Sequence, residues 1–198
     1  MRKFVCIGHD VPTSPTFSLD DLPGSGGRLD VLCRALSASL FLSHGIRETV
    51  QTYLVLQDEV TIRVNGGEVK YASPDERNLA SLIQRALERK EDAVGHAEVE
   101  STPGIHVSNR GLVPILDEVA STCTLVHLHE GGGPLDTLEP PENAAFVLSD
   151  HREFTDSELD EIQARADHRV TLGPRSIHGD HAISVAHNYL DTDGYRQY

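Results

Sequence analysis

The sequence predicts an α/β protein built on an open sheet, and two observations carry this prediction. A β-leaning segment at 168–172 passes through Gly173-Pro174 into a helix rich in small residues at 181–190. Two further apolar strands precede it, at 124–129 and 144–148, alternating with loops and helices. All three strands end in polar or glycine-bearing turns, and ligands of open α/β sheets bind at the carboxyl ends of strands. We therefore expect a binding site where these three ends meet.

The loop between the last strand and the last helix favours close approach of a ligand to the backbone. Pro174 fixes its own φ and keeps Gly173 out of the helical region, so the chain bends there. Gly179-Asp180 then supplies a flexible residue followed by an expected helix N-cap. Unpaired N–H groups at such a helix start can bind a ligand. A strand-loop-helix unit is also common as a plain structural connection.

The rest of the chain predicts alternating strands and helices. Asn65-Gly66, between alternating segments at 60–64 and 68–71, predicts a β-hairpin. Ser73 as N-cap and Glu76 as its capping-box partner predict a helix that continues to about Lys90. The other expected elements are a strand at 3–8, a long loop at 11–27, a helix at 29–43 ended by Gly45, a strand at 49–56, a strand at 104–108, a helix at 112–121 and a helix at 155–166 with a Thr155–Glu158 capping box.

Composition indicates a single acidic domain adapted to salt. The 198 residues carry a net charge of −14, and 14 of the 17 basic residues are arginine. Abundant Asp and Glu with few lysines is typical of a protein kept soluble in a salt-rich cytosol. Residues 1–110 carry a net charge of −3 and residues 111–198 carry −11, so we expect any anionic partner to contact the first part.

The sequence favours a cytoplasmic location without a membrane anchor. It contains no apolar run of about 18 residues, and the apolar segment at 4–7 is too short for a signal peptide. Cys6, Cys33 and Cys123 are widely spaced within apolar segments, which predicts reduced core cysteines.

Two groups of segments carry a family resemblance. The C-terminal group is Phe146-Val147-Leu148-Ser149-Asp150-His151, Thr171-Leu172-Gly173-Pro174-Arg175-Ser176 and His187-Asn188-Tyr189-Leu190-Asp191. The N-terminal group is Asp21-Leu22-Pro23-Gly24, residues 27–34, residues 42–47, residues 73–77 and Pro103-Gly104-Ile105. The first group resembles the SPOUT class of RNA methyltransferases. The second resembles one family within that class, the archaeal tRNA pseudouridine-54 N1-methyltransferases (TrmY), and an archaeal halophile would account for the composition.

This resemblance implies a fold, a cofactor and a substrate. The implied fold is a single domain over residues 1–198, with a mostly parallel sheet, helices on both faces and a C-terminal deep trefoil knot. Residues 1–110 would face RNA and residues 111–198 would bind S-adenosylmethionine (SAM). The implied reaction is methylation of N1 of pseudouridine 54 in the tRNA T-loop, carried out by a homodimer. The implied cofactor residues are Leu128, Ser149, Leu172, Gly173, Pro174, Arg175, Ser176, Ile177 and Ala182.

Methyl transfer to pseudouridine N1 requires loss of the N1 proton. A base could remove this proton, or nearby arginines could favour its loss by stabilising the resulting anion. Asp30 is the candidate base, with Arg28 and Arg77 as candidate catalytic arginines. The candidate RNA contacts are Arg28, Arg34, Arg47 and Arg77. Asp30 can equally form a structural ion pair with Arg28.

Three alternatives remain open at this stage. Ribosomal RNA could be the substrate in place of tRNA. His127 and His129 share one face of a predicted strand, and His178, His181 and His187 follow later, which allows a His-ligated metallohydrolase. No cysteine lies beside them, so we expect no metal. A non-enzymatic RNA-binding module is the third alternative.

Overall fold

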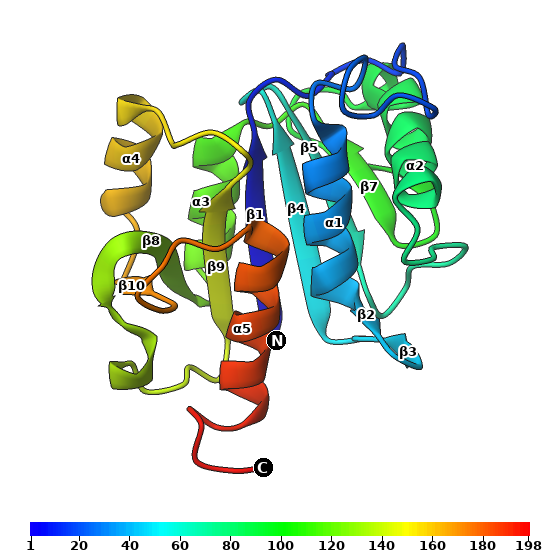
Figure 1. Cartoon of the computed structure of the whole chain (residues 1–198). Helices are drawn as coiled ribbons and strands as arrows, with labels where there is room; N and C mark the ends of the chain where they lie inside the picture. The colour runs from blue at the N-terminus through cyan, green and yellow to red at the C-terminus, as the bar shows by residue number, and fades with distance from the viewer.

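A computed structural model describes all 198 residues, and it contains one eight-stranded sheet in the order β10-β8-β9-β1-β4-β5-β7-β6 (Figure 1). Five neighbouring strands are parallel: β10 (His168–Thr171), β8 (Thr124–Pro134), β9 (Ala144–Ser149), β1 (Arg2–Gly8) and β4 (Val50–Leu56). The other three continue the sheet in antiparallel pairing: β5 (Val60–Asn65), β7 (Ile105–Ser108) and β6 (Val99–Thr102). The prediction of an open, mostly parallel sheet is confirmed.

Helices cover both faces of this sheet, as the resemblance implied (Figure 1). One face carries α1 (Leu29–Leu40), α2 (Glu76–Glu88) and α5 (Gly179–Asp191), and α1 packs against α5. The other face carries α3 (Leu112–Ala120) and α4 (Asp156–Gln163). Phe4 and Cys6 of β1 enter one core while Val5 and Ile7 enter the other. A strand covered on both faces must be apolar throughout, which explains the continuous run in β1.

The first helix is shorter than predicted, and a small hairpin follows it. Phe41 is extended at φ −90° and ψ 139°, so α1 ends at Leu40 and not at Ser43. Phe41–Leu42 (β2) pairs with Gly45–Ile46 (β3), and the N–H of Arg47 donates to the carbonyl of Leu40. The apolar residues keep helical spacing up to Leu40. The hairpin that follows then supplies a hydrogen-bond donor to a carbonyl group at the end of the helix.

The predicted hairpin at Asn65-Gly66 is wrong, because β5 forms its hairpin with β4. The connecting turn is Gln57-Asp58, where φ is 50° and 54°, as a type I′ turn requires. After Asn65 the chain bends back, since the N–H of Val69 donates to the Asn65 carbonyl, and 68–71 forms no strand. β7 takes the neighbouring place beside β5, and β6, which the sequence did not reveal, pairs with β7.

Helix starts show where capping was predicted correctly and where it was not. The Thr155–Glu158 capping box is present, although α4 ends at Gln163. Asp75, not Ser73, caps α2 by accepting the N–H of Asn78 at 2.8 Å. Helix α5 begins at Gly179, so Asp180 lies in its first turn instead of capping it. Two short 3-10 turns, Lys90–Asp92 (η1) and Leu135–Thr137 (η2), complete the secondary structure.

Strand β8 extends five residues beyond the predicted end at His129, through three glycines to Pro134. Its pairing with β10 shifts register between Arg169 and Val170, so Val170 pairs with Gly133. A Cβ on Gly132 would lie 2.5 Å from the Val170 carbonyl carbon, which explains why this approach requires glycine. No helix combines the length and apolar character needed to cross a membrane.

Candidate functional site

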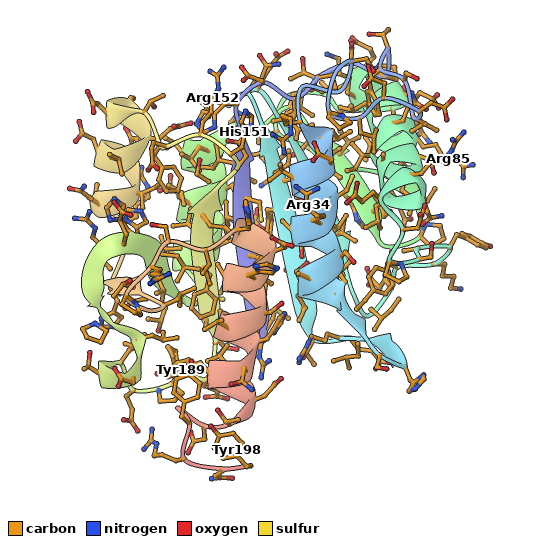
Figure 2. The ribbon with its side chains drawn as sticks, viewed as in Figure 1. Arg34, Arg85, His151, Arg152, Tyr189 and Tyr198 are labelled. Atoms are coloured by element: carbon orange, nitrogen blue, oxygen red, sulfur yellow. The ribbon has the colours of Figure 1, made fainter.

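A cavity of about 380 Å³ opens at the carboxyl ends of β9 and β10 and beside the middle of β8, where Leu128, His129 and Glu130 line it. Residues from the N-terminal parts of α1 and α5 complete its wall. His151 and Arg152 follow β9 at this end of the molecule, whereas Tyr189 and Tyr198 lie at the opposite end (Figure 2). The lining residues are Arg28, Val31, Arg34, residues 128–130, residues 148–154, Thr171, Leu172 and residues 175–179, with Ala182.

Seven of the nine residues that the resemblance assigned to a cofactor line this cavity. They are Leu128, Ser149, Leu172, Arg175, Ser176, Ile177 and Ala182. Gly173 and Pro174 belong to the same exposed loop but are not lining residues. The structure thus brings together residues of three strands and the loops after β9 and β10, from Leu128 to Ala182 in the sequence.

The loop after β9 contributes most of the residues that sequence reasoning missed. Asp150, His151, Arg152, Glu153 and Phe154 all line the cavity. The Asp150 side chain is fully buried and accepts the backbone N–H of His9 and of Arg152, each at 2.8 Å. The sequence signal was positional, because these residues directly follow the predicted end of the strand at 144–148.

Arg28, Asp30 and Arg34 form one cluster at the start of α1. Asp30 accepts hydrogen bonds from Arg28 Nε at 3.0 Å and Nη2 at 3.2 Å, and from Arg34 Nη1 at 2.9 Å. Burial disfavours the charge of Asp30, but these hydrogen bonds outweigh it, so the pKa of Asp30 lies below its usual value. Arg28 and Arg34 line the cavity and Asp30 lies behind them, so the structure contains the ion pair that the sequence allowed.

Arg77 and Arg47 lie outside the cavity. Arg77, in the first turn of α2, forms an ion pair with Asp20 and is well exposed. Its neighbour Glu76 lies 3.4 Å from Arg34, so Arg77 is near the cavity end of the molecule. Arg47 instead binds Asp191, the last residue of α5, about 14 Å along that helix from Ala182 at the cavity.

Most arginines have an acidic partner within the chain, but three do not. Arg85, Arg169 and Arg175 form no ion pair with a carboxylate. Arg169 contacts the ring of His129, with Nη2 at 2.7 Å from Nδ1. Arg85 lies on α2, away from the cavity (Figure 2). Arg175 is therefore the one carboxylate-free arginine that lines the cavity, where it adds positive charge to Arg28, Arg34 and Arg152.

The candidate histidines meet in pairs, His127 with His129 at 5.3 Å and His178 with His181 at 6.0 Å between ring centroids. Both ring nitrogens of the fully buried His127 lack hydrogen-bond partners, and burial lowers its pKa to about 4. His129 Nδ1 accepts the N–H of Gly131 at 2.9 Å. His187 contacts the Ser39 carbonyl and Arg2. No cluster of three or more His, Cys, Asp or Glu side chains is arranged to hold a metal ion.

Comparisons with known proteins identify the family of this chain. Residues 1–195 match the family model described as "Putative SAM-dependent RNA methyltransferase". Over the full length of both chains, the sequence is 54% identical to the tRNA (pseudouridine(54)-N(1))-methyltransferase of Haloferax volcanii and 55% identical to that of Halobacterium salinarum. The protein of the same name from Methanocella arvoryzae is 43% identical over 92% of this chain and 95% of its own.

A solved structure shares the fold at low sequence identity. It is the crystal structure of Archaeoglobus fulgidus Nep1 bound to S-adenosylhomocysteine, with a TM-score of 0.69 and 15% identity over 96% of this chain and 97% of that chain. The fold is therefore that of a SPOUT methyltransferase. Together with the full-length relatives and the matching family model, this places the chain in the archaeal tRNA (pseudouridine(54)-N(1))-methyltransferase family of SAM-dependent RNA methyltransferases.

Proposed function

We propose that this chain transfers a methyl group from SAM to N1 of pseudouridine 54 in the tRNA T-loop. The observation that supports this most directly is the cavity, where the residues assigned to the cofactor meet four arginines. An acidic protein that collects arginines around one cavity is suited to an anionic partner at that place. The names of the full-length relatives supply the substrate, and a cytoplasmic location follows from a tRNA substrate.

The cavity residues fit SAM in size and chemistry. Its volume of about 380 Å³ lies within the range of small-molecule sites. Leu128, Leu172 and Ile177 provide apolar wall, while the backbone of loops 149–154 and 173–178 provides polar groups. A Cβ on Gly179 would lie 3.2 Å from Leu148 Cδ1, so glycine keeps this wall open. When bound, SAM supplies an electrophilic methyl group.

The chain's own residues would position the base and stabilise its anion. Arg28 and Arg34 reach the cavity from α1, and Arg175 reaches it from the opposite loop with no competing carboxylate. Guanidinium groups held beside the uracil ring would stabilise the charge that develops as N1 loses its proton. This favours electrostatic assistance as the way in which the chain promotes loss of the N1 proton.

Asp30 fits a positioning role better than the role of base. Its oxygens already accept three hydrogen bonds from Arg28 and Arg34, and its pKa lies below its usual value. A carboxylate of lowered pKa is a weaker proton acceptor. We therefore propose that Asp30 holds the two arginines in the cavity wall. Arg77 would contact RNA beyond the cavity, whereas Arg47 would contact it only if a second chain brings it near.

We also propose a homodimer, with the C-terminal knot that the resemblance implies. The loop 173–178 beside the cavity is exposed, and the Ile177 side chain is 44% exposed although it lines the site. A second copy covering this loop would enclose the cofactor. Light scattering in high salt tests this, because a monomer at working concentration would contradict it.

Methyl transfer to defined tRNA substrates tests the proposed reaction. Labelled SAM would be incubated in high salt with T-loop transcripts that carry either uridine or pseudouridine at position 54. Incorporation with pseudouridine alone is the expected result. Equal incorporation into both transcripts would contradict N1 methylation of pseudouridine. Incorporation into ribosomal RNA fragments but into neither transcript would identify the alternative substrate.

A further inference from the structure

His9 connects three elements that surround the cavity. It follows β1, and its backbone N–H donates to Asp150 Oδ2 at 2.8 Å. Its ring Nδ1 lies 2.9 Å from Asp150 Oδ1, in the loop after β9. Its ring Nε2 lies 3.1 Å from Glu158 Oε2, in the first turn of α4. The loop held in this way, residues 149–154, is the segment that contributes most residues to the cavity wall.

The surroundings of His9 require both ring nitrogens to donate. Glu158 Oε2 also accepts the N–H of Thr155 at 2.7 Å and its hydroxyl at 2.9 Å, so Glu158 is an acceptor. Asp150 accepts two backbone N–H groups and is an acceptor in the same way. An imidazole that faces a carboxylate at each nitrogen can satisfy both contacts only when it carries both protons. The contact geometry is therefore that of an imidazolium ion.

The wider charge distribution also favours this proton. Asp10, in the loop after β1, binds Arg152 at 2.5 Å and lies 3.8 Å from His151. His151 in turn lies 3.6 Å from Asp150. Arg28 lines the same cavity but is engaged with Asp30. His9 is thus the one cationic partner of Glu158 and the nearest one of Asp150, which His151 at 3.6 Å and the charge of Arg28 also face.

We propose that His9 is a protonation-dependent positioning residue, which holds loop 149–154 in the shape that binds the cofactor. It touches neither cofactor nor substrate and acts through Asp150. Without its proton, one ring nitrogen becomes an acceptor facing a carboxylate, so one of the two contacts is lost. The cavity wall then loosens and cofactor affinity falls. This inference rests on the proposed function, because it takes the cavity to be the SAM site.

The direction of the pH effect follows from the groups around His9. Burial alone would lower the pKa of His9, but the hydrogen bonds and charges of Asp150 and Glu158 outweigh it and raise the pKa above its usual 6.5. The folded form therefore retains the proton above the pH at which the unfolded chain loses it. Both contacts of the His9 ring, with Asp150 and with Glu158, are therefore present below about pH 6.5. One of them is lost as the pH rises through the raised pKa of His9.

Calorimetric titration of the full-length chain with S-adenosylhomocysteine, from about pH 5.5 to about pH 9, tests the inference. We expect wild-type affinity to fall about tenfold as the pH rises, which corresponds to loss of one charge-assisted hydrogen bond. His9→Gln carries both of its donor hydrogens on one nitrogen and does not titrate, so it should keep at most one of the two contacts and its affinity should be low and independent of pH. His96→Gln removes an exposed histidine outside the cavity and should match the wild type. Wild-type affinity that is constant with pH, or the wild-type pH profile retained in His9→Gln, would overturn the proposal.

A second measurement does not depend on cofactor binding or on the variant. The backbone N–H groups of His9 and Arg152 both donate to Asp150, so their protection from hydrogen exchange should fall in the wild type over the same pH range. Protection unchanged across that range would overturn the inference. Absence of S-adenosylhomocysteine binding at every pH would instead contradict the proposed function, while the exchange data would still decide the role of His9.

Discussion

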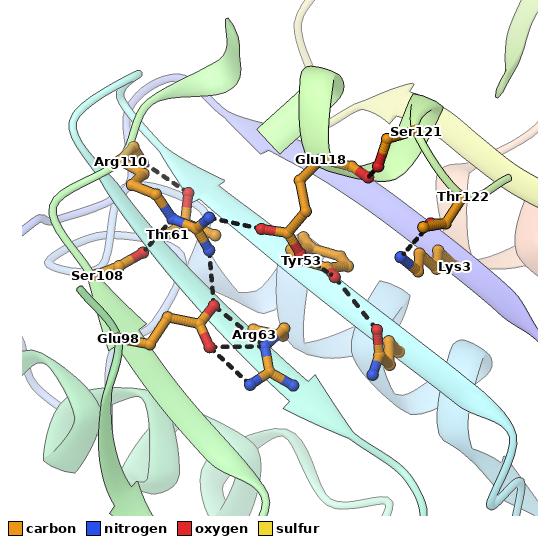
Figure 3. A network of polar contacts seen from close by, with 11 residues as sticks. Lys3, Tyr53, Thr61, Arg63, Glu98, Ser108, Arg110, Glu118, Ser121 and Thr122 are labelled. Carbon is orange, nitrogen blue, oxygen red and sulfur yellow. Dashed lines mark hydrogen bonds and ion pairs between the residues drawn. The ribbon is translucent and has the colours of Figure 1, made fainter. Parts of the chain in front are cut away.

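Arginines and carboxylates gather in two places, beside the antiparallel strands and at the cavity near the carboxyl ends of β9 and β10. Arg63 of β5 makes a bidentate contact with Glu98, and its Nη2 lies 2.6 Å from Glu98 Oε2 (Figure 3). Arg110 bridges Glu98 at 2.6 Å and Glu118 at 2.5 Å, and its Nε donates to Ser108. Every one of these charged groups has a charged partner within the chain.

The cluster at the cavity has the same residue types but is not saturated. Arg175 has no carboxylate partner, and the Arg28 side chain is 42% exposed although it binds Asp30. By contrast, the Arg63 and Arg110 side chains are only 16% and 11% exposed. Residue type alone therefore does not distinguish a structural cluster from a binding site. Unused hydrogen-bond donors beside a cavity distinguish the two.

The largest effect should come from breaking the saturated cluster. Glu98→Ala leaves two half-buried guanidinium groups without their shared partner, so we expect a loss of about 3 kcal/mol in unfolding free energy. Denaturation by urea in high salt would measure it. The control Glu59→Ala removes an exposed carboxylate 4.0 Å from Lys90 and should change stability by less than about 0.5 kcal/mol. Loss of methyl transfer per folded molecule in Glu98→Ala would contradict the structural role.

The next effect should appear in activity and not in stability. Arg175→Ala removes no internal ion pair, so stability should be unchanged, while kcat/KM for RNA should fall about 30-fold, or about 2 kcal/mol. Arg85→Ala is the matched control, because Arg85 also lacks a carboxylate partner but lies outside the cavity. An equal loss of kcat/KM in both variants would show that RNA responds only to positive charge on the protein, wherever it lies. Unchanged kcat/KM in Arg175→Ala would contradict the proposed role of Arg175.

The strands of the parallel half could be predicted from the sequence, whereas in the antiparallel half β5 and β7 were predicted as strands but their pairing and β6 were not. Strands β1 and β9 and the first residues of β8 are covered on both faces, so each appears as an apolar run whatever its partners, whereas the edge strand β10 buries only Val170. The Asn65-Gly66 pair matched the local hairpin signal, but Gln57-Asp58 makes the turn because β4 and β5 bury their apolar residues together. Pairing between distant segments, such as β5 with β7, leaves no local signal.

The site could be predicted only in part for a similar reason. Loop 171–177 carried its own signal in glycine, proline and family resemblance. His9 and Asp150 are separated by 141 positions, and nothing near either residue in the sequence reveals the contact. Arg28 and Asp30 are two positions apart, so their pairing could be expected, whereas the opening of Arg28 into a cavity depends on β9 and α5.

His127 is a third kind of polar group, buried and without partners, and its replacement should produce the smallest change. Its ring lies 5.3 Å from the rings of His129 and Phe154, directly behind the cavity wall. Both of its nitrogens lack partners, so His127→Leu should raise the unfolding free energy at neutral pH by about 1 kcal/mol. Loss of more than about 1 kcal/mol would instead show that the imidazole makes hydrogen bonds in solution.

The pH dependence of the same variant gives a second, independent check. Burial lowers the pKa of His127 to about 4, so between its usual 6.5 and that value the unfolded chain binds more protons than the folded chain. His127 therefore lowers the unfolding free energy of the wild type as the pH falls through this window. Below about pH 4 it lowers that free energy no further. The advantage of His127→Leu should grow over the same window, while the acid effects of His187 and the carboxylates act equally on both proteins. An advantage that stays constant from neutral pH to about pH 4 would mean that His127 is solvated in the folded protein, and that the wall behind the cavity is open to water.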